Sequence, residues 1–212
     1  MLEKVTALVL RPARKGVEIL VFEHPNAGLQ LPAGTVDPGE KPPEAVLREL
    51  REETGLTEVR LVKKLGQETE TLPPGWGVLT ETVALRSAPA ADAPTLAPPM
   101  GRGWRVQTGE VKGSFIYLSY AEIPLKGKSR KPLWQVAGWA PRRIVAASLR
   151  RHFFWLQTRS STPLGWEWEA ENDLGHTFAL RWVPLHPAPD LVEPQKSWLT
   201  WAKDITLADT LS

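Results

Sequence analysis

The 212-residue sequence contains no cysteine, which excludes disulfide bonds, thiolate metal sites and a cysteine nucleophile. It also lacks an apolar run of the roughly 18 to 20 residues that a membrane-spanning helix needs. Residues 1–11 have the pattern of a strand rather than of a signal peptide. We therefore predict a cytoplasmic protein that does not bind membranes and whose core is stabilised by packing alone.

Neither sign of charge is in large excess, because the formal net charge is only +2. This value is too close to neutral to predict a nucleic-acid partner. Two dense basic stretches, which we interpret first as solvated surface, are Lys126–Lys131 and the arginines Arg142, Arg143, Arg150 and Arg151. The 42% hydrophobic and 24% charged residues are typical of one globular domain, spanning residues 1–212.

The first 65 residues alternate between strand-like and turn-like composition. Residues 5–10 and 17–22 are short β-branched and apolar runs, and both are predicted to be strands. A loop rich in Gly, Pro, Asn and Asp follows over residues 25–39. Residues 43–54 are predicted to form a helix that Gly55 ends in the left-handed conformation, before a further strand over residues 59–65.

The middle of the chain, residues 72–148, is less regular and contains an Ala/Pro-rich segment over residues 87–100. We predict that it is a β-rich insertion, which governs substrate choice or homodimer formation rather than chemistry. Its expected elements are strands at 77–86, 104–108 and 114–123, and an amphipathic helix at 141–151. After it we expect strands at 152–158 and 177–185, joined by a loop containing residues 166–171, and a final helix at 193–203.

Three glutamates of the predicted helix are spaced so that they converge on one face. Glu49, Glu52 and Glu53 stand at i, i+3 and i+4. A neighbouring face carries apolar side chains that can pack on a sheet, namely Val46, Leu47 and Leu50. One helix thus both anchors itself and presents three carboxylates.

Carboxylates placed this close repel one another unless cations balance them. Arg48, one turn before Glu52, supplies one positive charge, and a hard divalent ion can supply the rest. Mg²⁺ suits the array best, since it prefers oxygen ligands and leaves positions for substrate phosphate oxygens. Glu40 and the backbone carbonyl of Gly34 are candidate further ligands.

Glutamate-rich helices with interspersed arginine are most often solvated surface, but here the whole pattern is more specific. Residues 34–56 resemble the Nudix box: Gly, five residues, Glu, seven residues, then Arg-Glu-apolar-any-Glu-Glu-any-Gly-apolar. The fixed positions are filled by Gly34, Glu40, Arg48, Glu49, Leu50, Glu52, Glu53, Gly55 and Leu56.

The resemblance implies an α/β fold, specifically an α/β/α sandwich around a mixed sheet. It further implies that the box glutamates bind Mg²⁺ or Mn²⁺, with Glu52 and Glu53 as principal ligands. Glu49 would be a ligand or the base that orients water, and Arg48 would hold these carboxylates in place. In the family, a further acidic residue from a late loop often approaches the metals. Glu169, within the predicted loop 166–171, is our candidate for this catalytic residue.

These features favour a metal-dependent pyrophosphohydrolase acting on a nucleoside diphosphate linked to another small group. Two alternatives remain open. One is a nucleotide-sensing Nudix domain without turnover, which the intact carboxylates disfavour. The other is an RNA 5'-pyrophosphohydrolase that uses the basic stretches to track phosphates, which the near-neutral charge disfavours.

Overall fold

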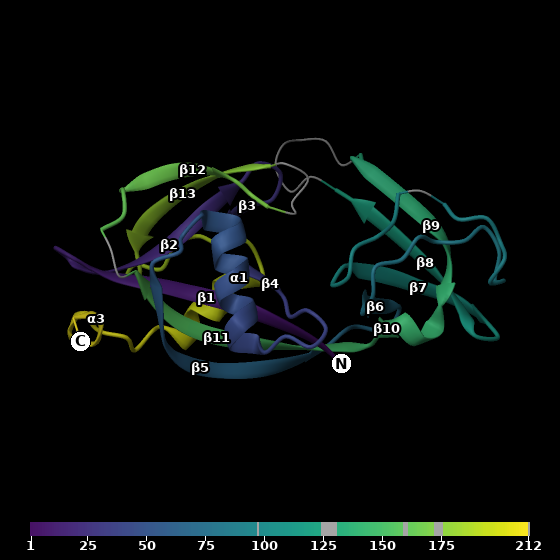
Figure 1. Cartoon of the computed structure of the whole chain (residues 1–212), viewed down its shortest axis with the longest axis horizontal. Coiled ribbons are helices and arrows are strands. Elements are labelled where there is room, and N and C mark those ends of the chain that lie inside the picture. The colour runs from purple at the N-terminus through teal and green to yellow at the C-terminus, as the bar shows by residue number, and fades with distance from the viewer. Residues whose placement is uncertain (97, 124–130, 159–160, 172–175, 212) are drawn as a thin grey trace. The chain divides into compact units, whose positions relative to one another are not determined.

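The structure is a computed structural model that describes residues 1–96, 98–123, 131–158, 161–171 and 176–211 (Figure 1). The chain divides into two compact units. The first unit comprises residues 4–67 and 151–212, and the second unit comprises residues 1–3 and 68–150. Across the described residues, no helix is long and apolar enough to cross a membrane.

The first unit is built on a large sheet whose strands follow the order β12-β13-β2-β1-β11-β5, with β3 added to β2 and β4 added to β1. The strands are β1 (Leu2–Ala13), β2 (Gly16–His24), β3 (Gly28–Gln30), β4 (Ala33–Thr35), β5 (Val59–Thr71), β11 (Ser148–Thr158), β12 (Gly165–Glu169) and β13 (Thr177–Pro184). The strands predicted near residues 5, 17, 59, 152 and 177 are all present; the first four extend beyond their apolar runs, and the last, β13, ends one residue before its predicted end.

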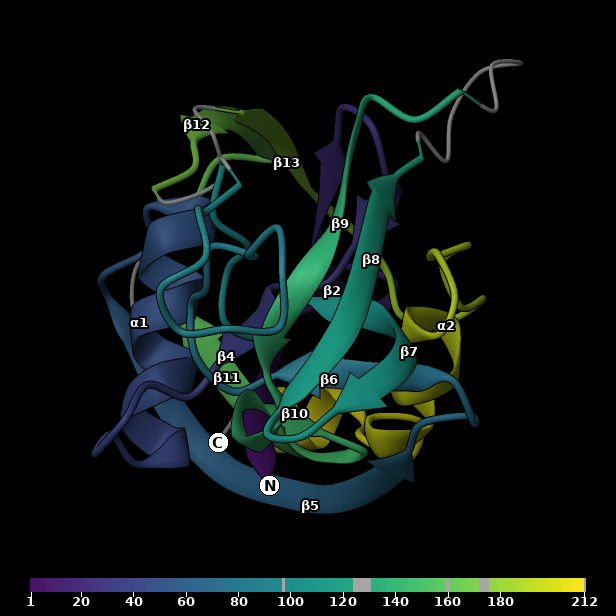
Figure 2. The same ribbon diagram turned by 90° about the vertical axis from the view of Figure 1, so that its right-hand side faces the viewer.

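Helices cover both faces of this sheet, because successive side chains of its strands alternate between two cores. On one face, Phe22 and Phe154 pack with Val46 and Leu50 of helix α1 (Pro42–Thr54). On the other, Val21 and Phe153 share a core with the turns α2 (Gln195–Trp198) and η2 (Leu199–Trp201). Figure 2 shows α1 and α2 on opposite sides of the sheet. This arrangement confirms the predicted α/β/α sandwich, although the last predicted helix is two short turns, followed by α3 (Leu207–Thr210).

Helix α1 begins and ends as its sequence predicts. Two prolines occupy its first turn, where their missing N–H groups cost nothing. It ends at Gly55, which has a φ of 73° that glycine adopts without strain. One expectation for the helix was wrong: Leu47 is 37% exposed and does not pack on the sheet with Val46 and Leu50, and the third buried apolar residue is Ala45.

The second unit contains a separate five-stranded sheet in the order β10-β6-β7-β8-β9. Its strands are β6 (Trp76–Leu79), β7 (Arg105–Lys112), β8 (Phe115–Glu122), β9 (Trp134–Pro141) and β10 (Val145–Ala146). One face of the sheet packs a core that includes Leu79, Val106 and Leu118, together with Leu85 and Met100 from the long connection between β6 and β7. The strand predicted over residues 77–86 therefore ends early, at Leu79.

The amphipathic helix predicted over residues 141–151 is absent. This stretch forms a 3₁₀ turn (Arg142–Ile144), strand β10 and the start of β11. Pairing of β10 with β6, which matches Val145 to Leu79, satisfies the backbone there and overrides the helical periodicity. The prediction that Arg151 is solvated was also wrong, since it is buried.

Arg151 instead stabilises the first unit from within. Its Nη1 donates to the carbonyl of Val5 and to Oγ1 of Thr6, at 3.2 and 3.0 Å, and its guanidinium lies 4.0 Å from the ring centre of Trp198. It is therefore unavailable as part of a phosphate-tracking surface. Of the other basic stretch, Lys126–Lys131, residues 126–130 lie outside the described residues.

The contrast between Leu50 and Leu47 gives a test of how α1 is anchored. Leu50 is fully buried, so Leu50→Ala should lower the free energy of unfolding by about 2 to 5 kcal/mol through lost transfer energy and a cavity. Leu47→Ala, the same substitution on the exposed side, should change it by no more than about 0.5 kcal/mol. Equilibrium urea unfolding measures both values, and equal effects of the two substitutions would contradict this packing.

Candidate active site

The box helix α1 lies against the short strand β4, and matched repeats hold the two together. The backbone N–H groups of Thr35 and Ala33 donate to Glu49 Oε1 and Glu53 Oε2, both at 2.9 Å. One helical turn of four residues rises about 6.0 Å, and two residues of a strand rise about 6.6 Å. Two glutamates four residues apart on the helix can therefore each accept from one of two amides that lie two residues apart on the strand. The order of the contacts shows that the helix and strand run in opposite directions.

Gly34 lies between these two amides and is the point of closest approach. A Cβ placed on Gly34 would lie 1.8 Å from the Glu49 carboxyl carbon and about as close to both of its oxygens. Any side chain here would displace the Glu49 carboxylate. The box glycine is thus explained by space, since its strand needs no special φ.

Arg48 joins the carboxylates of the box into one network. Its Nε and Nη2 each lie 3.0 Å from one of the two oxygens of Glu40, a two-pronged pairing that suits the planar guanidinium. Its Nη1 contacts Glu49 Oε1 at 3.0 Å and Glu52 Oε2 at 3.1 Å. Nη2 also donates to the carbonyl of Thr35 at 2.9 Å.

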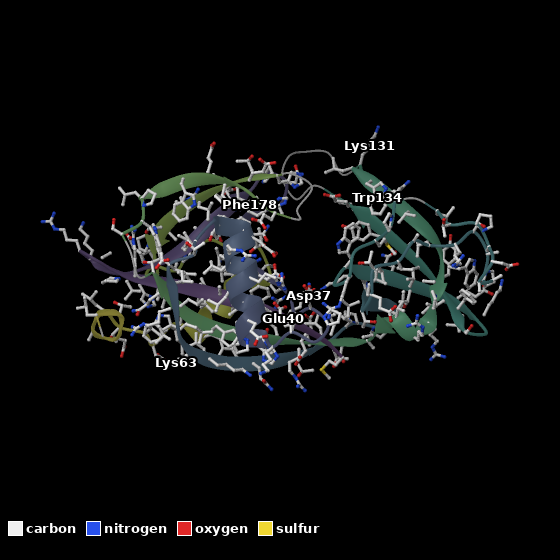
Figure 3. All side chains as sticks on the ribbon, viewed as in Figure 1. Asp37, Glu40, Lys63, Lys131, Trp134 and Phe178 are labelled. Atoms are coloured by element: carbon white, nitrogen blue, oxygen red, sulfur yellow. The ribbon has the colours of Figure 1, made fainter. Side chains whose placement is uncertain are left out.

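This network fixes the loop that enters α1. Glu40 Oε2 accepts the backbone N–H of Asp37 at 2.9 Å, and the Asp37 carboxylate lies 3.7 Å from Arg48 Nη2. Figure 3 labels Asp37 and Glu40 near the end of α1 remote from Phe178. One cation therefore organises both the entry loop and the carboxylate face of the helix.

The network shifts the protonation equilibria of its members. Its hydrogen bond to Glu40 raises the pKa of Arg48 above its ordinary value, so the guanidinium stays charged. Burial raises the pKa of Glu49, an effect that the neighbouring Arg48 charge opposes without cancelling. The charged form of the buried Glu49 is thus less favourable than that of a glutamate in water.

The structure brings all the predicted box residues together, but the carboxylates differ in how many of their oxygens pair with Arg48. Both oxygens of Glu40 pair with Arg48, so the arrangement favours a structural role for Glu40 over metal binding. Glu49 and Glu52 each use one oxygen in the contacts above and keep a second for another ligand. In the described part of the chain, no group of three or more His, Asp or Glu side chains is arranged as a preformed metal centre.

The loop predicted over residues 166–171 is largely strand β12, paired with β13. Trp166 and Trp168 point toward α1, where their indole N–H groups donate to the carbonyls of Thr54 and Glu52 at 2.9 and 3.0 Å. Alternation therefore places Glu169 with Glu167 on the exposed side, away from the helix. The structure gives no support to Glu169 as the catalytic carboxylate.

The alternation of tryptophan and glutamate is visible in the sequence of β12, but the sequence does not show which of the two sides of the strand faces the box helix. In β12 the glutamates and tryptophans take opposite sides, with the indoles on the side of α1. The backbone of the next acidic residue, Glu171, does reach the box helix, because its N–H donates to the carbonyl of Glu52 at 3.1 Å.

With this geometry in place, the chain can be compared with known proteins. The family model described as NUDIX domain matches residues 2–139, more than half of the chain. The chain therefore belongs to the NUDIX domain family, whose enzymes are hydrolases that act on phosphoanhydride bonds of nucleotide-type substrates and generally use divalent metals. No curated protein matches it.

Solved structures similar to this chain include two of an Ap4A hydrolase from C. elegans. The first, a binary complex, has a TM-score of 0.46 and 13% identity, and the match covers 95% of each chain. The second has a TM-score of 0.37 and 14% identity, and covers 89% of this chain and 83% of the other.

The raised pKa of Glu49 predicts how stability depends on pH in EDTA. A carboxyl whose pKa is higher in the folded state stabilises the fold below its unfolded pKa, and this contribution is lost as pH rises through the folded value. Relative to the Glu49→Gln variant, the parent should therefore become progressively less stable as pH rises above about 4.3, the ordinary pKa of a glutamate. Urea unfolding at stepped pH measures this difference, and a difference that is constant or of opposite slope would contradict the assignment.

Proposed function

We propose that this protein is a divalent-metal-dependent pyrophosphohydrolase that cleaves a phosphoanhydride bond in a nucleoside diphosphate linked to another small group. The observation that carries the proposal is the assembled box. Glu49, Glu52 and Glu53 lie along one helix that is anchored on strand β4, with Arg48 among them. Family membership supports hydrolysis, and the carboxylates support the metal.

The donor set fits Mg²⁺ or Mn²⁺. The second oxygens of Glu49 and Glu52, together with Glu53 one residue further, offer hard ligands from adjacent turns of one rigid element. The residues that would hold the ion are thus Glu52 and Glu53 as principal ligands and Glu49 as a further one. When bound, the ion supplies neutralisation of the diphosphate and a more acidic water.

The chain's own residues then have distinct tasks. Arg48 keeps Glu49 and Glu52 oriented, since it contacts one oxygen of each. Glu49, held by the Thr35 amide as well, is positioned to ligate or to accept a proton from water. Its raised pKa suits a base, because a carboxylate that is costly to keep charged takes up a proton more readily. The Gly34 carbonyl remains a proposed further ligand.

The metal assignment is tested by removing carboxylate charge without changing shape. Glu52→Gln and Glu53→Gln should each lower kcat at least about a hundredfold, because a metal ligand is lost. Glu58→Gln, the same change at an exposed position after the helix, should leave kcat within about threefold. The measurement is formation of nucleoside monophosphate and of its phosphorylated co-product from a nucleotide panel with Mg²⁺ or Mn²⁺, together with phosphate or pyrophosphate where a panel member releases them.

Two results of this experiment would overturn the proposal. One is full activity in EDTA, which would exclude metal dependence. The other is normal turnover in either box variant when circular dichroism shows an unchanged fold. The same assay, extended to a 5'-triphosphorylated RNA, separates small-molecule turnover from the two alternatives. A sensing domain binds nucleotides without turnover, and an RNA-directed enzyme prefers the RNA to free nucleotides.

We also propose that residues 72–148 are an insertion within one Nudix domain that governs substrate choice or homodimer formation rather than chemistry. Two observations support this. The box residues belong to the first unit, as do strands β4 and β12, which contact the box helix. One face of the second unit's sheet lines a cavity of about 670 Å³, with Trp76, Gln107 and Ser119 in one cross-strand row.

The lining of that cavity suits a small molecule or a second protein surface. Trp76 is 42% exposed, and Gln107 and Gln135 add amide groups that both donate and accept. A flat indole beside neutral hydrogen-bonding groups is a combination found at ligand sites and at interfaces.

Substitution of Trp76 tests this role. Trp76→Ala should raise KM at least about fivefold for part of the nucleotide panel, or shift the oligomeric state, with kcat for the best substrate within about threefold. Leu133→Ala, at another exposed apolar position of the same unit, should do neither. Steady-state kinetics and light scattering after gel filtration are the measurements. A uniform loss of kcat, or no effect on any of these quantities, would contradict the proposal.

A further inference from the structure

The C-terminal turn of α1 carries two of the box glutamates, and its backbone carbonyls lack partners within the helix. Here two of these carbonyls accept hydrogen bonds from three donors that lie in or just after strand β12. The carbonyl of Glu52 accepts from the Trp168 indole at 3.0 Å and from the N–H of Glu171 at 3.1 Å. The carbonyl of Thr54 accepts from the Trp166 indole at 2.9 Å.

The two indoles reach the helix because of their place in β12. Cross-strand pairing sets Trp166 opposite Leu180 and Trp168 opposite Phe178, both of which are buried residues of the core under α1. The side chains of the two tryptophans are partly buried against the same core. Their positions are therefore fixed by the sheet rather than by the helix they contact.

Gly55 shows how closely one indole fits the end of the helix. A Cβ on Gly55 would lie 2.6 Å from the nearest ring atom of Trp168. The ring therefore lies directly against the backbone that ends the helix, while its N–H holds the carbonyl of Glu52, three residues earlier. Trp168 thus constrains the turn by contact and by hydrogen bonding.

We infer that Trp166 and Trp168 are positioning residues, which set the orientation of Glu52 and Glu53 toward the metal and so tune metal affinity and turnover. This inference rests on the proposed function. Neither indole is a ligand or touches a reacting atom. The effect is transmitted through the backbone: Glu52 and Glu53 project from the turn whose carbonyls the indoles hold, and the orientation of a ligand commonly depends on such outer contacts.

A purely structural role would have different consequences. Loss of one hydrogen bond to a carbonyl lowers stability, but it leaves the metal affinity of the folded protein unchanged. Positioning, in contrast, acts on the folded protein. Metal affinity and kcat measured well below the unfolding transition therefore separate the two roles.

The matched test compares Trp→Phe at three positions. Trp168→Phe and Trp166→Phe keep an aromatic ring and remove the indole N–H. The control is Trp182→Phe in β13, in the same core, since the indole nitrogen of Trp182 has no hydrogen-bond partner in the structure as described. Mn²⁺ affinity is measured directly by calorimetry and by electron paramagnetic resonance, alongside kcat, KM and urea unfolding.

We expect Trp168→Phe to weaken Mn²⁺ binding about 10-fold to 100-fold and to lower kcat comparably, with KM nearly unchanged. Trp166→Phe should have the same effects to a smaller extent, because its carbonyl partner belongs to Thr54, beyond both glutamates. Trp182→Phe should match the parent within about threefold. If Trp168→Phe does not fold, Trp166→Phe supplies the second variant, since it removes the other indole N–H that holds the same turn.

The outcomes distinguish this inference from the proposed function. If the parent binds Mn²⁺ and the Trp168 and Trp166 variants match Trp182→Phe in affinity and kcat, the positioning role is overturned and the metal-dependent hydrolase stands. If the parent binds no Mn²⁺ and is fully active in EDTA, both are overturned. A loss of Mn²⁺ affinity confined to the β12 variants supports both.

Discussion

The candidate site depends above all on the placement of one guanidinium among several carboxylates. Glu40, Glu49 and Glu52 approach one another closely enough that their charges would repel, and Arg48 contacts all three. Its forked geometry lets it meet two oxygens of Glu40 and still reach the helix carboxylates one residue and one turn away. Without this cation, the loop of the box would lose the ion pairs that connect it to the carboxylates of the helix.

A second constraint is the match between a helical turn and a pair of strand residues. Because these repeats rise by nearly equal distances, β4 can hold Glu49 and Glu53 through alternate amides while its other edge pairs with β1. The box helix is thereby attached to the central sheet by its functional side chains as well as by its apolar face. Gly34 is required where the two elements come closest.

The opposite end of the helix is fixed by different means. There, β12 and its indoles hold the final carbonyls, and Gly55 gives the ring of Trp168 access to the backbone. Segments more than a hundred residues apart thus determine the geometry of a motif that is continuous in the sequence. The second unit contributes a separate sheet with its own core, which includes Leu79 and Leu118.

The sequence by itself determined the box, its helix and five strands of the large sheet, because these depend on local spacing: glutamates at i, i+3 and i+4, a proline start, a glycine end and apolar strand runs. Strands β3, β4 and β12 lie in segments predicted to be loops. The alternation of tryptophan and glutamate over residues 166–169 also places the two residue types on opposite sides once the segment is extended. Only the tertiary structure decided which side meets the helix, that Glu40 serves Arg48, that Leu47 is exposed, and that residues 141–151 are not helical. The pairing of Glu40 with Arg48 depends on how the entry loop folds back on the helix, and the other features depend on partners distant in the chain. Local periodicity contains no information about which partner a strand or a guanidinium will meet.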